Sequence, residues 1–139
     1  MELALLKVTT ELIDVPLVFD DDGNVKAGFK VVGADSDEYQ TIEREYRLLN
    51  VKRTARRGRG IDAKSDPGAK EVLDVLAKRE MALLNACIKE TYGFTTKGQP
   101  AVLGEELLTE IFAARPTWKL KTLTVIESEE LFIKASSAG

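Results

Sequence analysis

Residues 13–46 read IDVPLVFDDDGNVKAGFKVVGADSDEYQTIEREY, and this stretch holds the strongest structural signals of the chain. Every odd-numbered residue from Ile13 to Phe19 is apolar, a period of two that is typical of a strand with one buried face. Gly23-Asn24 supplies residues that tolerate a positive φ in a tight turn, and a second β-rich run extends from Val25 to Gly33. The pattern predicts an antiparallel β-hairpin over residues 13–32.

A helix is predicted immediately after the hairpin, over residues 36–52. Asp35, Ser36 or Asp37 can cap it by accepting a hydrogen bond from a free backbone N–H, and Glu38 favours the positive end of the helix dipole. Apolar residues then recur at spacings of three, four and three, which places them on one helical face. They are Tyr39, Ile42, Tyr46 and Leu49.

Three further helices are predicted, over residues 68–90, 104–115 and 117–124. The first follows Ser65-Asp66-Pro67, where Ser or Asp caps a helix and Pro fits its first turn. Pro116 ends the second, because proline disfavours a helical residue before it. The longest helix carries the apolar stripe Leu73, Ala77, Met81, Leu84 and Ile88, widened by Leu76 and Cys87.

The predicted fold class is α+β, a predominantly helical body with a small N-terminal antiparallel β-hairpin. A chain of 139 residues, 44% of them hydrophobic, suits a single domain over residues 1–134, followed by a flexible tail at 135–139. Residues 3–8 are a candidate third strand. The stripes on the two longest helices are either two faces of one core or part of a self-association seam; periodicity does not separate these interpretations.

Composition argues against several classes of protein. The formal charge is −3, whereas a dedicated nucleic-acid-binding domain is usually strongly basic. Cys87 is the only cysteine, so a disulfide within the chain is excluded and a reducing compartment is expected. No run approaches the ~18 apolar residues of a membrane span, and residues 1–6 are too short and acidic for a secretory signal. We expect a soluble intracellular protein.

The chain contains no histidine, which removes the commonest general base and metal ligand. A Ser-His-Asp triad, a Cys-His pair and a His/Cys zinc site are therefore excluded within one chain. The run Asp20–Asn24 is a hairpin turn rather than a calcium loop, because Val18 and Phe29 stand where such a loop needs acidic ligands. Gly58-Arg59-Gly60 lacks the Gly-Lys-Ser/Thr of a phosphate-binding loop. We predict no enzyme activity, cofactor or metal.

Two features are candidate partner-binding sites. Arginines cluster just after the first predicted helix, at Arg53, Arg56, Arg57 and Arg59. This segment is the frayed, solvated end of the helix or a loop, or else it binds an acidic protein surface or nucleic acid. Trp118 either packs in the core between helices or is an exposed anchor for a partner. Cys87 is interpreted as a buried packing residue.

Several short motifs follow one another in an order typical of one known family. The hairpin 15–32, with Asp-Gly-Asn at its tip, leads through VGADSDEY (32–39) into a helix. Cys87-Ile88 precedes the aromatic-glycine corner Tyr92-Gly93-Phe94, and LGEELL (103–108) precedes RPTW (115–118). Over residues 12–133 the chain thereby resembles the tail assembly chaperones of long-tailed bacteriophages. Relatives often have a tryptophan at the glycine corner, where this chain has two other aromatic residues.

The resemblance implies a non-catalytic function. Members of that family are small, largely helical proteins of the host cell cytoplasm that coat the aggregation-prone tape measure protein and help to recruit tail tube subunits. They leave before the virion is complete, and self-association is also implied. Two alternatives stay open: a structural tail-completion or connector protein that remains in the virion, and a prophage nucleic-acid-binding regulator that uses Arg53–Arg59. Helical stripes suit the binding of an amphipathic helix in an apolar groove.

Overall fold

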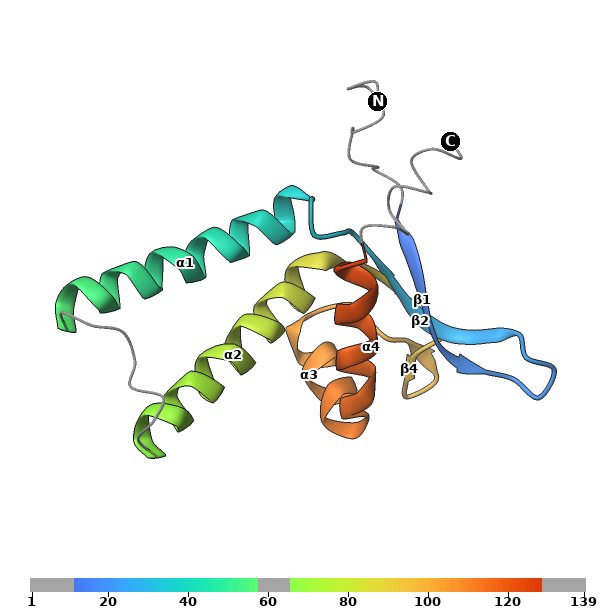
Figure 1. The fold of residues 1–139 in the computed structure, drawn as a ribbon. Coiled ribbons are helices and arrows are strands. Elements are labelled where there is room, and N and C mark those ends of the chain that lie inside the picture. The colour runs from blue at the N-terminus through green and yellow to red at the C-terminus, as the bar shows by residue number, and fades with distance from the viewer. Residues whose placement is uncertain (1–11, 58–65, 129–139) are drawn as a thin grey trace, which may run out of the picture.

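The computed structural model describes residues 12–57 and 66–128 (Figure 1). The fold is α+β with an N-terminal β-hairpin, as the sequence predicts. The candidate strand at 3–8, the tail at 135–139 and Arg59 lie outside the described residues. The elements are, in chain order, β1 (Ile13–Phe19), β2 (Val25–Val31), α1 (Asp37–Arg57), α2 (Asp66–Cys87), β3 (Ile88–Tyr92), β4 (Thr95–Thr96), β5 (Gln99–Pro100), α3 (Glu105–Ala114) and α4 (Pro116–Ile126).

The predicted hairpin is confirmed, and one aspartate closes its turn. β1 and β2 pair antiparallel along their length. Asp20 Oδ1 accepts hydrogen bonds from the backbone N–H groups of Asp22 and Asn24, both at 2.9 Å. Of the two residues expected to take a positive φ, only Gly23 does so, at 85°. Asn24 keeps an ordinary conformation, because the side-chain bonds of Asp20 shape the turn.

A third strand lies where the sequence predicts the end of a helix. α2 stops at Cys87 instead of continuing to residue 90, and Ile88–Tyr92 pairs antiparallel with β2, which gives the strand order β1-β2-β3. Pairing with β2 satisfies the backbone groups of this segment, and this tertiary interaction overrides the helical pattern. The segment predicted as a loop after it contains the short β4–β5 hairpin, with Lys97 and Gly98 at φ 52° and 78°.

The helix α1 begins where it was predicted and ends later. Ser36 caps it: its Oγ accepts a hydrogen bond from the Tyr39 N–H at 3.2 Å and donates one to the Gly33 carbonyl at 2.5 Å. The helix continues to Arg57, so the end predicted at residue 52 is wrong and the basic run 52–57 is helical. Arginine and lysine are good helix formers, and positive charge is favourable at a helix C-terminus.

The core lies between one face of the three-stranded sheet and the helices α2, α3 and α4. The helices α1 and α2 lie side by side and project from the sheet as a pair (Figure 1). We call this pair the arm, residues 46–57 and 66–77 its distal half, and the sheet with α3 and α4 the body. The most deeply buried core residues are Val15, Phe29, Val31, Leu83, Leu84, Cys87, Leu108 and Ile126.

Candidate functional site

Exposed apolar side chains gather on the distal half of the arm. Among the described residues, nine large hydrophobic side chains are exposed, and five of them lie in this region. A single exposed leucine is ordinary on a protein surface, whereas a group on one pair of helices is typical of a binding surface. The five are Leu48 (53% exposed), Leu49 (41%), Val51 (58%), Leu73 (67%) and Leu76 (45%).

On α2, the exposed leucines continue the face that packs against the body. Leu76 lies seven residues before Leu83, which is fully buried. Leu73 lies seven residues before Glu80, whose carboxylate is 3.7 Å from Lys119 Nζ of α4. Residues seven apart share a helical face. The two exposed leucines therefore point to the same side as the residues that contact the body.

On α1, the same relation holds for Leu49. It lies seven residues after Ile42, which packs against the core. In Figure 1 the arm extends well beyond α3 and α4, which stand beside the C-terminal part of α2. Leu49, Leu73 and Leu76 thus lie at the outer end of helical faces whose inner ends contact the core or the body. We call these three residues the open stripe.

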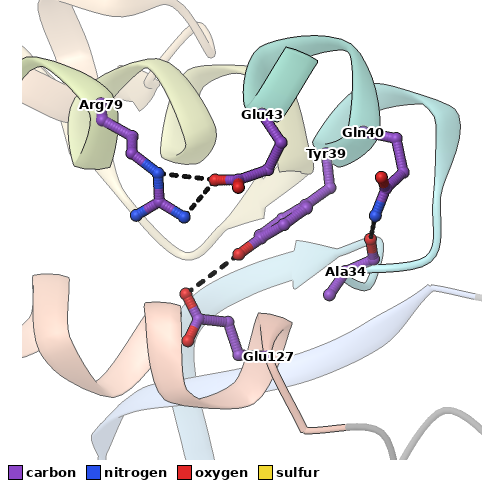
Figure 2. A network of polar contacts seen from close by, with 6 residues as sticks. All are labelled: Ala34, Tyr39, Gln40, Glu43, Arg79 and Glu127. Carbon is purple, nitrogen blue, oxygen red and sulfur yellow. Dashed lines mark hydrogen bonds and ion pairs between the residues drawn. The ribbon is translucent and has the colours of Figure 1, made fainter. Parts of the chain in front are cut away.

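Polar contacts fix the base of the arm (Figure 2). Arg79 Nε of α2 donates a hydrogen bond to Glu43 of α1 at 2.6 Å, and the same two side chains form an ion pair. The Tyr39 hydroxyl donates to Glu127, just after α4, at 3.3 Å. Burial and the Glu127 carboxylate raise the pKa of Tyr39, so it remains a donor at neutral pH. Burial lowers the pKa of Arg79, but Glu43 offsets this effect and the pKa is raised.

An open groove of about 240 Å³ lies between the two arm helices, and Glu43 and Arg79 of this network form part of its lining. Tyr46, Leu49 and Val75 supply its apolar walls, and Arg47 and Asn50 supply polar groups. One residue of the open stripe therefore also lines the groove. A side chain from a bound helix could enter such a hollow while its neighbours cover the exposed leucines.

The predicted arginine cluster lies at the tip of the arm. Arg53, Arg56 and Arg57 belong to the last turns of α1, while Arg59 lies outside the described residues. Between Arg47 and Arg57 the sequence has five basic residues and no acidic residue. The basic run and the open stripe therefore share one end of the molecule.

Trp118 lies elsewhere, in the first turn of α4. Its half-buried ring packs against the core, with its centroid 6.2 Å from that of Phe94. The Arg115 guanidinium lies 5.0 Å over the ring, close enough for a cation–π contact. The structure thus gives this tryptophan a packing role, and its helix α4 lies away from the C-terminal end of α1 (Figure 1).

Other polar and titratable groups lie on the sheet and at the end of α2. An open depression of about 550 Å³ lies on the sheet, where Lys30 stands opposite both Asp14 and Glu90 in the strand register. Burial and the Asp14 carboxylate, which accepts its hydrogen bond, raise the pKa of Tyr92 to about 12. Burial raises the pKa of the Cys87 thiol to about 12, which disfavours the nucleophilic thiolate. Within residues 12–57 and 66–128, no cluster of acidic or cysteine side chains is placed to hold a metal.

Comparisons of the chain with protein-family models, with curated proteins and with solved structures gave no match. None of the described helices is long and apolar enough to cross a membrane. The surface of the arm combines exposed leucines, a groove of mixed polarity and a basic tip.

Proposed function

We propose that this chain is a phage tail assembly chaperone that binds the tape measure protein through its arm, keeps it soluble and helps to recruit tail tube subunits. The observation that carries the proposal is the open stripe, in which leucines 41–67% exposed continue helical faces that contact the core and the body. The family resemblance over residues 12–133 supplies the identity of the partner.

The surface chemistry suits this function. A tape measure protein is a long helix with exposed apolar positions, and an apolar face on a rigid helix pair recognises such a segment. The affinity of each copy of the chain can be low, because many copies aligned on one tape measure protein bind with high avidity. Shielding of apolar surface requires no reactive side chain.

Co-expression with a candidate tape measure protein tests the proposal. The chain should keep the tape measure protein in the soluble fraction and co-purify with it. Leu73→Asp combined with Leu76→Asp should abolish both effects. Leu120→Asp is the matched control, because Leu120 is 70% exposed but lies on α4 of the body. Equal behaviour of the two variants, or an insoluble tape measure protein beside the unaltered chain, would contradict the proposal.

Two alternatives give different outcomes in direct assays. A tail-completion or connector protein would use the same stripe for a permanent contact and would be stoichiometric in purified virions, whereas an assembly chaperone is absent from them. A nucleic-acid-binding regulator would bind DNA in a salt-dependent way and lose this binding in the Arg56→Ala, Arg57→Ala variant. The chain's net charge of −3 disfavours the regulator.

A further inference from the structure

Basic residues outnumber acidic residues in the distal half of the arm. Arg47 and Lys52 of α1 and Lys70 of α2 are exposed in the distal half of the arm, and three more arginines follow in the last turns of α1. The distal half of α2 also carries three acidic residues, Asp66, Glu71 and Asp74. The distal half is thus basic in a chain whose net charge is −3.

We infer that the open stripe is the docking site of an amphipathic helix that carries acidic residues beside its apolar face. The inference rests on the proposed function and specifies which segments of a long helical partner the arm selects. The leucines supply apolar contact, and the basic flank supplies attraction to glutamate or aspartate side chains and sets the register of the bound helix.

The geometry accommodates one helix. A docked helix would lie over the distal halves of α1 and α2, with one side chain in the groove lined by Leu49 and Val75. The distal part of α2 comprises residues 66–77, a length of roughly 18 Å, so a partner segment of three to four turns covers it. That segment would lie next to α3 and α4. It would cover the distal half of α2 in the way that α3 and α4 cover its C-terminal part.

A second copy of this chain fits the surface poorly. Contact between the α1 helices of two copies would bring together two runs of five basic residues, each with no acidic residue from Arg47 to Arg57. Juxtaposed like charges oppose such an interface, whereas an acidic helix is attracted. The charge therefore favours a different polypeptide as the occupant.

Two synthetic peptides of about 18 residues test the inference with the full-length chain. Both place leucine at helical i, i+3, i+4 and i+7 positions, and one flanks these leucines with glutamate while the other has lysine instead. Fluorescence anisotropy should show at least about tenfold tighter binding of the glutamate peptide, and added salt should weaken that binding. Equal binding of the two peptides would overturn the inference.

Substitutions in the chain, with a matched control, test where the glutamate peptide binds. Leu73→Ala with Leu76→Ala should weaken binding of the glutamate peptide at least about tenfold, because both leucines lose contact area. Leu120→Ala, on the body, should leave it unchanged. Replacing Arg53, Arg56 and Arg57 by glutamine should remove most of the salt dependence. Unchanged binding in the stripe variant, or sedimentation showing a dimer that this variant abolishes, would overturn the inference.

The two proposals can fail separately. If the tape measure protein co-purifies through the arm while neither peptide binds, the acidic-helix inference is wrong and the chaperone function stands. If the glutamate peptide binds at the stripe while the tape measure protein stays insoluble, the docking site is right and its assignment to tail assembly is wrong.

Discussion

Two leucines one heptad apart on α2 provide a direct test of whether the open stripe is uncovered in the isolated protein. Leu83 is 0% exposed, and Leu76, on the same helical face, is 45% exposed. Leu83→Ala and Leu76→Ala remove the same atoms from the same helix, so intrinsic helix propensity changes equally in both. Any difference in the free energy of unfolding therefore reports the surroundings of the two side chains.

The expected costs differ severalfold. A buried Leu→Ala substitution lowers the free energy of unfolding by roughly 3–5 kcal/mol, because it loses transfer free energy and leaves a cavity. Leu76 is about half buried, so its substitution loses about half of the ~1.5–3 kcal/mol of a fully buried leucine, and alanine recovers a few tenths through helix propensity. We expect about 1 kcal/mol for Leu76→Ala.

Urea denaturation followed by circular dichroism measures the difference. With a typical urea dependence of ~1–3 kcal/mol per molar, the two midpoints should differ by about 1–2 M. Equal costs at low protein concentration would refute the reasoning, because Leu76 would then be covered within a single chain. A cost for Leu76→Ala that grows with protein concentration would instead show that a second copy covers the stripe.

Three further outcomes follow from single contacts. Ser36→Ala should lower the free energy of unfolding by about 1 kcal/mol in chemical denaturation through loss of the α1 cap, and Ser36→Thr should restore most of it. Gly93→Ala should destabilise more than Gly98→Ala: both have φ near 80°, but only at Gly93 would the new Cβ overlap the β2 backbone. Tyr92 has its pKa raised from 10.0 to about 12, so the native state holds this proton more tightly. Its stabilising contribution is complete below pH 10 and is lost towards pH 12. The melting temperature of the Tyr92→Phe variant should therefore fall less between pH 10 and pH 12 than that of the unaltered chain.

Features set by local chemistry could be predicted from the sequence. The alternation from Ile13 to Phe19 and the glycine turn specify the hairpin, and the hydroxyl of Ser36 marks the start of α1. The end of α2 could not be predicted in this way. Its last expected turn becomes β3 because β2 offers a strand edge from another part of the chain, and helical periodicity contains no information about that pairing.

The stripe on α2 shows what periodicity leaves undetermined. Leu73 and Leu84 belong to one predicted apolar face, yet the first is 67% exposed and the second is fully buried. Spacing indicates which side of a helix is apolar, whereas burial depends on how far α3 and α4 reach along it. The arginine cluster was visible as composition, but its position beside exposed leucines follows only once α1 is seen to continue to Arg57.

The polar contacts that fix the arm lie at its base, away from the exposed leucines of its distal half. The arm is held at its base by the Arg79–Glu43 and Tyr39–Glu127 contacts, which do not involve the open stripe. A helix can therefore dock on the distal half without breaking these contacts or opening the core. Little of the free energy of binding then has to offset rearrangement of the chain. The three exposed leucines of the open stripe can accordingly hold a partner weakly and release it, as the proposed chaperone function requires.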